Sequence, residues 1–116
     1  MEAVNVYLPT DTFSHKLERI KRSDPPGFKR IRKVIERLLV KPQDADGKMH
    51  GIYQGRLKKY VGRRDYRVIY NWCRLCRKEN RRMQQDCDNC ETIPDNSVIF
   101  FDLYHKNDKK KFKKNT

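Results

Sequence analysis

The spacing of apolar residues changes along the first part of the chain and predicts a strand followed by two helices. Residues 3–8 alternate apolar and polar side chains, which predicts a β-strand that ends at Pro9. Apolar residues then recur at helical spacing over residues 12–22, and again as a clear stripe over residues 26–40. Pro42 disfavours helical geometry in the residue before it, so the second helix is expected to end near residue 40.

The rest of the chain has the alternation that is typical of strands. Residues 41–53 are polar and contain glycine, which predicts a connecting loop. Strands are expected at residues 56–61, 66–73 and 97–105, and the middle one is rich in β-branched and aromatic residues. This order predicts a single α+β domain over residues 1–116, in which a helical hairpin packs on a curved, mainly antiparallel four-stranded sheet. The later strands are expected to lie antiparallel beside the first.

Strict alternation also assigns side chains to faces of the predicted sheet. Three sets are expected to share a face within their own strand: Arg56, Lys58 and Tyr60; Arg67, Ile69 and Asn71; and Ile99, Phe101, Leu103 and His105. A sheet face that carries Lys58, Arg67 and His105 would bind phosphates. The structural alternative is that Arg67 pairs with an acid such as Asp65 or Asp102.

The charge of the chain narrows the class of partner. Its 116 residues include 28 Lys and Arg but 15 Asp and Glu, which gives a net charge of +13. Polyanions neutralise such a charge best, so nucleic acid is the leading partner and an acidic protein the second. The sequence contains no apolar run long enough for a membrane span and no secretion signal, so we expect a cytoplasmic protein without a membrane partner.

Four cysteines form two C-x2-C pairs between the last two predicted strands. The pairs are Cys73 with Cys76 and Cys87 with Cys90, separated by ten residues. Four thiolates at this spacing are typical of a tetrahedral Zn²⁺ site. Because protein would fill all four positions, the zinc is expected to be structural, within an insert at residues 73–90. Two disulfides or four free thiols are the alternatives.

Two runs of residues resemble the RelE/ParE superfamily of toxins. They are GRLKKYVGRRDYRVIY at residues 55–70 and LYHKNDKKKF at residues 103–112, and the expected element order is similar to that family's fold. The resemblance implies a toxin that cleaves messenger RNA, often at the ribosome, and that is held inactive by an antitoxin. It also implies that no catalytic metal is needed, since the 2′-OH attacks the adjacent phosphate. The cysteine insert is foreign to the best-known members.

The resemblance assigns roles residue by residue. Arg67 matches the arginine of the family's Tyr-Arg motif and would contact the scissile phosphate, while Lys58 matches a charge-stabilising lysine. A second family lysine falls at Tyr60, which would stack on a base or position the 2′-OH. The family's terminal aromatic residue corresponds to Phe112 or Tyr104.

Because a phenylalanine at this terminal position moves no proton, acid–base catalysis would fall to His105, whose imidazole titrates near neutral pH. Further RNA phosphates would be bound by five cations: Arg56, Arg63, Arg64, Lys106 and Lys109.

A toxin also implies a partner protein. The antitoxin would be an acidic or amphipathic helical segment that covers the basic face and hides Arg67. Two other functions fit the same residues. One is a non-catalytic, ParE-like toxin that inhibits gyrase, and the other is a zinc-containing module that only binds nucleic acid.

Overall fold

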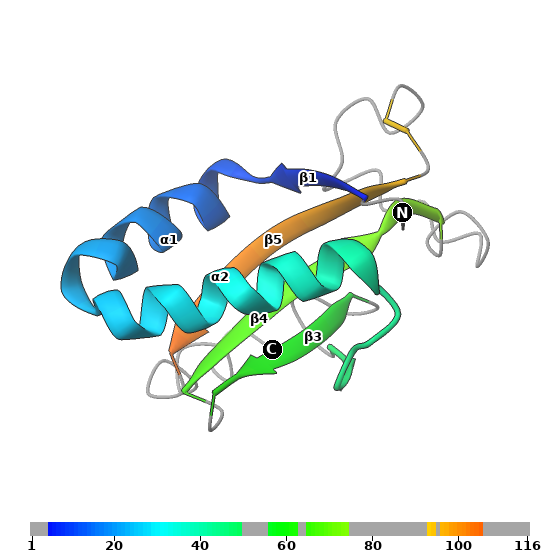
Figure 1. Cartoon of the computed structure of the whole chain (residues 1–116). Coiled ribbons are helices and arrows are strands. Elements are labelled where there is room, and N and C mark those ends of the chain that lie inside the picture. Colours follow the sequence, from blue (N-terminus) through cyan, green and yellow to red (C-terminus); the bar gives the residue numbers. More distant parts are fainter. Residues whose placement is uncertain (1–4, 50–55, 63–64, 75–92, 95, 106–116) are drawn as a thin grey trace.

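The protein folds as two layers, with two helices packed on one face of a five-stranded mixed sheet (Figure 1). The computed structural model describes residues 5–49, 56–62, 65–74, 93–94 and 96–105. The elements are β1 (Val6–Pro9), α1 (Asp11–Ser23), α2 (Pro25–Val40), β2 (Gly47–Lys48), β3 (Leu57–Val61), β4 (Tyr66–Trp72) and β5 (Ser97–His105). The prediction of an α+β fold with a helical hairpin is therefore confirmed. Neither described helix has the length and apolar character that a membrane span requires.

The sheet has the order β1-β5-β4-β3-β2, which differs from the predicted meander in two ways. First, β1 lies beside β5 and runs parallel to it, with Val6 opposite Ser97, so the expectation of an antiparallel neighbour for the first strand is wrong. The chain between these two strands contains both helices and three further strands, which is long enough for a parallel connection. Second, a short strand, β2, forms in the segment expected to be a loop and pairs antiparallel with β3.

Local capping explains where the two helices begin. The Thr10 hydroxyl accepts a hydrogen bond from the amide of Phe13 at 3.2 Å and caps α1. Asp24 separates the helices and caps α2, since its carboxylate accepts from the Gly27 amide at 3.1 Å. Pro25 follows directly, at a position where a missing amide hydrogen costs nothing. The hairpin is therefore closed by a single residue that ends one helix and starts the next.

The main hydrophobic core fills the space between the helices and the sheet. Its fully buried members come from both layers: Phe13, Ile31, Leu38, Val61, Val68, Tyr70, Val98 and Phe100. The hydroxyl of Tyr70 donates to the carbonyl of Pro42 at 2.7 Å, so this buried phenol has a hydrogen-bond partner. We call this side of the sheet the helix face.

A β-bulge interrupts the pairing of β4 with β5 and decides which face each later residue of β5 occupies. Ile69 pairs with Asp102 but Tyr70 pairs with Phe100, so Phe101 is an extra residue in β5. Phe100 and Leu103 both pack in the core of the helix face, whereas Phe101 packs in a second cluster on the opposite face. The prediction that Ile99, Phe101, Leu103 and His105 share one face is therefore wrong, because the extra residue reverses the alternation.

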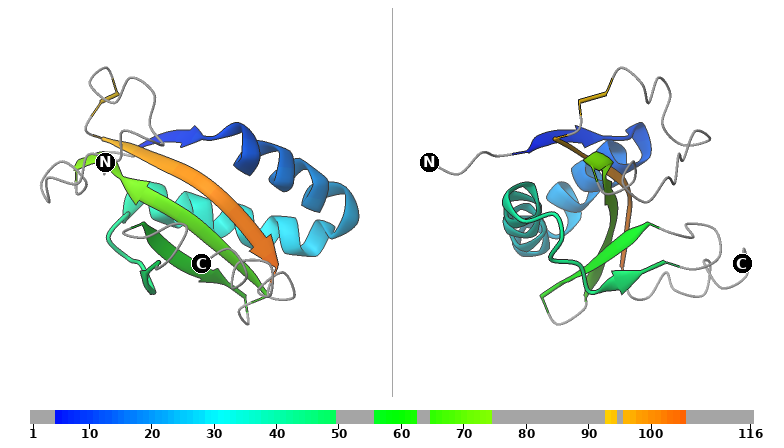
Figure 2. Two further views of the ribbon diagram at one scale, coloured as in Figure 1. Left: turned by 180° about the vertical axis from the view of Figure 1, so that it is seen from behind. Right: turned by 90° about the vertical axis from the view of Figure 1, so that its right-hand side faces the viewer.

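The opposite side of the sheet, which we call the open face, carries the second and smaller apolar cluster. Figure 2 (left) shows the sheet from this side, with the helices behind it. The buried members of the cluster are Met49, Ile69, Cys73, Ile99, Phe101 and Tyr104. The candidate functional residues of β3 and β4 lie on the same face.

Candidate nucleic-acid interface

Arg67 lies at the centre of a row of polar side chains that crosses three strands on the open face. It is directly opposite Tyr60 of β3 and Tyr104 of β5 in the sheet register. Its Nη1 donates to the hydroxyl of Tyr104 at 2.9 Å and its Nη2 donates to the hydroxyl of Tyr60 at 3.1 Å. The guanidinium is thus held from both sides by cross-strand neighbours. We call Lys58, Tyr60, Arg67 and Tyr104 the Arg67 cluster.

Aromatic rings also line the two cations of this cluster. The Cζ atom of Arg67 lies 4.7 Å from the ring centroid of Tyr60 and 5.4 Å from that of Tyr104. The ammonium of Lys58 lies 5.7 Å from the Tyr60 ring. Because a cation is attracted to the negative face of an aromatic ring, these contacts favour one arrangement of the charged groups. The cluster therefore presents two positive charges beside aromatic rings.

Burial differs among the members of the cluster and sets what each can do. Tyr104 is only 4% exposed, whereas Lys58, Tyr60 and Arg67 are half-buried and reach the surface. Burial raises the pKa of Tyr104 above its ordinary value, and the neighbouring Arg67 opposes this change without cancelling it. The Tyr104 phenol therefore keeps its proton at neutral pH. Lys58, Tyr60 and Arg67 are therefore the members of the cluster that a ligand could reach.

The alternative that Arg67 pairs with an acid such as Asp65 or Asp102 does not match its contacts in the described part of the chain. Asp102 forms an ion pair with Lys16 at 2.6 Å, and Asp65 lies 3.8 Å from Arg30. The hydrogen-bond partners of Arg67 there are the two tyrosines. A guanidinium held by neutral hydroxyls keeps its full positive charge for an anionic ligand.

His105 is not part of this cluster, in contrast to the grouping expected from the sequence. It pairs with Tyr66 across the strands, and the two rings meet edge to face with centroids 5.1 Å apart. Tyr66 belongs to the core of the helix face, opposite the face that carries Arg67. The bulge explains the difference, because it turns Tyr104 toward Arg67 and His105 toward the helices.

Tyr66, whose ring contacts His105, also makes a hydrogen bond on the helix face. The hydroxyl of Tyr66 donates to Asp24 at 2.8 Å. This hydrogen bond, followed by the one from the Gly27 amide, lowers the pKa of Asp24. Burial, together with the carboxylate of Asp24, raises the pKa of Tyr66 to about 12. The contact ties β4 to the junction of the two helices.

The remaining predicted RNA-binding residues divide into one that is buried and four that lie outside the described residues. Arg56 is 3% exposed, and its Cζ lies 4.2 Å above the ring of Phe101. This placement makes Arg56 part of the packing of the open face and removes it from the surface that a phosphate would touch. Arg63, Arg64, Lys106 and Lys109 are outside the described residues, as is Phe112.

The predicted zinc ligands are described only in part. Cys73 directly follows β4 and is 6% exposed. Cys76, Cys87 and Cys90 lie outside the described residues. Within the described ranges, no group of three or more His, Cys, Asp or Glu side chains is placed to hold a metal ion.

Tyr104 is the residue of the cluster that the sequence did not assign on its own. The resemblance to the family names Tyr104 only as one of two positions, with Phe112, for a terminal aromatic residue. The signal for its placement is Asp102, a carboxylate within the otherwise apolar run SVIFFDLY. A buried acid in such a strand indicates a local break in the alternation, since a regular strand would carry it into the core.

No protein-family model, curated protein or solved structure matches this chain. The resemblance to the RelE/ParE superfamily therefore stays a prediction from residues 55–70 and 103–112 and from the element order.

Proposed function

We propose that this chain is an RNA-cleaving toxin similar to the RelE/ParE superfamily, and that it holds a backbone phosphate at Arg67. The observation that carries the proposal is the guanidinium anchored by two tyrosine hydroxyls beside Lys58 on the open face. Guanidinium has five N–H donors, and the contacts to Tyr60 and Tyr104 orient those that are left for a phosphate. The net charge of +13 supports a polyanionic ligand.

The chemistry would be attack of the 2′-OH oxygen on the adjacent phosphorus. The bond from phosphorus to the 5′-oxygen breaks, which leaves a 2′,3′-cyclic phosphate and a free 5′-OH. Arg67 and Lys58 would stabilise the dianionic phosphorane, in which negative charge on the phosphate oxygens is greatest. These two cations thus supply the electrostatic part of the catalysis.

Proton transfer would pass through a tyrosine rather than through His105. We assign protonation of the leaving 5′-oxygen to Tyr60, because its hydroxyl lies beside Arg67 at 3.1 Å and its side chain is half-buried. Among the described residues, no imidazole or carboxylate hydrogen-bonds to Arg67. The proton of the 2′-OH is therefore assigned to water.

The experiment measures binding and cleavage separately. Binding is followed by fluorescence anisotropy with a 2′-O-methyl RNA, which lacks the attacking hydroxyl, and cleavage with unmodified RNA whose new ends are mapped. We expect Arg67→Gln to lower the cleavage rate at least about 100-fold and to lower the salt slope of binding by about one. Arg32→Gln is the control, because Arg32 lies on the exposed side of α2 beside Glu36 at 3.6 Å.

A chain that binds RNA without cutting it is the second candidate function. The position of His105 on the helix face favours it, since the one imidazole expected to move protons is away from Arg67. Binding of 2′-O-methyl RNA that depends on Arg67, without any cleavage of unmodified RNA, would establish this candidate. No binding and no cleavage by the wild type would reject both, and would favour a ParE-like gyrase inhibitor.

We also propose an acidic or helical antitoxin that covers the Arg67 cluster. Such a segment would supply the counter-charge for Lys58 and Arg67 and would exclude RNA from the open face. The proposal predicts that an acidic partner and 2′-O-methyl RNA compete for the same surface. Charge reversal at Arg67 should therefore weaken both interactions.

A structural Zn²⁺ bound by Cys73, Cys76, Cys87 and Cys90 completes the proposal. It rests on the spacing of the two C-x2-C pairs and on the position of Cys73 at the end of β4. We expect about one zinc per purified chain, and a thiolate absorption band when Co²⁺ replaces it. Replacement of Cys87 and Cys90 by Ser should abolish the band, whereas a disulfide-bonded chain would show neither metal nor band.

A further inference from the structure

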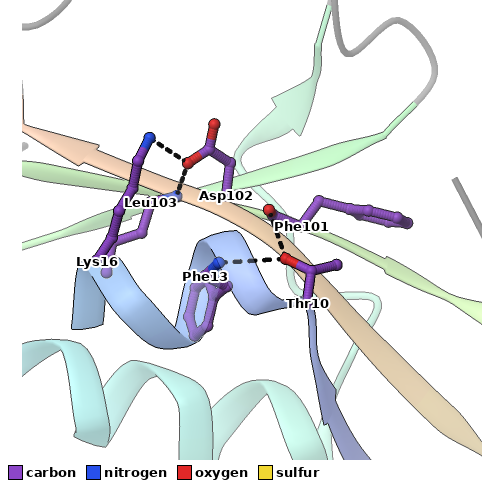
Figure 3. A network of polar contacts seen from close by, with 6 residues as sticks. All are labelled: Thr10, Phe13, Lys16, Phe101, Asp102 and Leu103. Atoms are coloured by element: carbon purple, nitrogen blue, oxygen red, sulfur yellow. Dashed lines mark hydrogen bonds and ion pairs between the residues drawn. The ribbon is translucent and has the colours of Figure 1, made fainter. Parts of the chain in front are cut away.

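Three side chains hold the bulge of β5 against α1 (Figure 3). The hydroxyl of Thr10 donates to the carbonyl of Phe101 at 2.9 Å while it caps α1. The ammonium of Lys16 donates to Oδ1 of Asp102 at 2.6 Å. The same carboxylate oxygen accepts from the amide of Leu103 at 2.7 Å. We call Thr10, Lys16 and Asp102 the bulge clamp.

The bulge decides which residue of β5 meets Arg67. If the pairing of Tyr70 with Phe100 continued without an extra residue, Arg67 would lie opposite Leu103 instead of Tyr104. Asp102 would then lie opposite Val68, whose side chain is fully buried in the core of the helix face. A carboxylate in that position would be costly. The bulge therefore keeps the charge out of the core and turns Tyr104 to the open face in one step.

The two charged groups of the clamp differ in burial, and the buried carboxylate makes the ion pair a strong local constraint. The side chain of Asp102 is 4% exposed and that of Lys16 is 37% exposed. Removing the cation takes an ion pair away from a buried carboxylate, which costs more than the loss of a surface pair. The amide of Leu103 also donates to this carboxylate.

We propose that Asp102, held by Lys16, is a positioning residue that sets the bulge and thereby presents Tyr104 to Arg67. Lys16 belongs to α1 in the helix layer and the side chain of Asp102 is almost fully buried, so neither lies on the surface that RNA is expected to contact. The consequence for RNA cleavage rests on the proposed function. The placement of Tyr104 does not.

The test compares Lys16→Met and Asp102→Asn with a charge-matched control. The control is Lys29→Met, which removes an exposed lysine from α2. Ring signals of Tyr104 are recorded by NMR with ¹³C-labelled tyrosine, and Arg67→Ala shows the signal of a Tyr104 without its guanidinium. We expect both clamp variants to shift the Tyr104 signal toward that reference and to slow RNA cleavage about tenfold, the effect of one lost hydrogen bond.

Rescue separates positioning from general destabilisation. Lys16→Arg keeps the cation and should restore both the Tyr104 signal and the cleavage rate, whereas Lys29→Met should change neither. A wild-type Tyr104 signal in folded Lys16→Met and Asp102→Asn would overturn the proposal. If Asp102→Asn does not fold, Lys16→Met decides, since its side chain is partly exposed. If the wild type cleaves no RNA, the proposed function fails while the Tyr104 signal still tests the clamp.

Discussion

The two faces of the sheet are built from the same strands but have different kinds of contacts. On the helix face, Val68, Tyr70 and Phe100 are fully buried under α1 and α2. On the open face, the neighbouring positions of β3 and β4 carry Tyr60 and Arg67, which are half-buried. Alternation along a strand therefore lets one sequence stabilise the fold on one side and offer a charged surface on the other.

Tyrosine shows the contrast most clearly, because its hydroxyl has opposite hydrogen-bond roles on the two faces. On the helix face, Tyr66 donates to Asp24 and Tyr70 donates to the carbonyl of Pro42. On the open face, Tyr60 and Tyr104 accept from the guanidinium of Arg67. The phenols of the helix face therefore bind fixed protein acceptors, whereas those of the open face bind a cation.

The largest expected effect is a loss of stability from a substitution in the core of the helix face. Leu38→Ala removes a fully buried side chain of α2 from the core. We expect the free energy of unfolding to fall by about 3 kcal/mol, from lost burial and the cavity left behind. Urea denaturation measures the loss. RNA affinity of the folded fraction should be unchanged, because Leu38 packs on the side away from Arg67.

A matched control for this prediction lies two residues along the same helix. The side chain of Val40 is 37% exposed, so Val40→Ala should cost less than about 1 kcal/mol. Equal losses for Leu38→Ala and Val40→Ala would contradict the assignment of the core to the helix face.

The next largest effect is slower RNA cleavage after a substitution on the open face. Tyr104→Phe removes the hydroxyl that accepts from Nη1 of Arg67 and leaves that donor without its buried partner. We expect cleavage to slow about tenfold, with a loss of stability of about 1 kcal/mol. Tyr60→Phe should slow cleavage further if its hydroxyl protonates the leaving oxygen. Initial rates on unmodified RNA, with urea denaturation beside them, measure both effects.

Tyr7→Phe is the control for these two changes, since the Tyr7 ring contacts Phe100 in a tilted arrangement on the helix face and is 37% exposed. Its cleavage rate should equal that of the wild type. If Tyr60→Phe cleaves at the wild-type rate, the proton donor is not this phenol, and the chain binds RNA through Arg67 without the proposed proton transfer.

Regular periodicity explains why much of the fold was predictable. Both helices follow apolar stripes of 3.6-residue period, and the β3 and β4 rows that place Tyr60 and Arg67 on one face follow strict alternation. The parallel pairing of β1 with β5 was not predicted, since it depends on where the last strand enters the sheet and not on any local pattern. β2, with two residues, is too short to have a periodic signal.

The candidate site was predictable up to the bulge and not beyond it. Arg67 and Tyr60 lie before it in the sequence and occupy the expected face. Tyr104 and His105 lie after it, so one extra residue exchanges their faces. The contacts that hold the bulge join β5 to a helix about 90 residues earlier in the chain. Such long-range contacts leave no trace in a local hydrophobic pattern.

The smallest expected effect is a loss of stability after a tyrosine of the helix face is changed. Tyr66→Phe removes the hydroxyl that donates across to the helix junction. At neutral pH we expect a loss of about 1 kcal/mol, the usual net contribution of one hydrogen bond. Urea denaturation of the wild type and the variant over a series of pH values measures it.

The pH dependence of that difference has a definite sign at each end. The pKa of Asp24 is lowered mainly by Tyr66, so its stabilisation is present above the ordinary value of 3.8 and is lost as the pH falls through the lowered pKa. The pKa of Tyr66 is raised to about 12, so its stabilisation is present below the ordinary value of 10.0 and is lost as the pH rises toward 12. The wild type should therefore lose its stability advantage over Tyr66→Phe at both extremes.

RNA cleavage at neutral pH should be unchanged in this variant, since Tyr66 contacts His105 and not Arg67. A marked fall in cleavage would instead assign the imidazole on the helix face to the reaction.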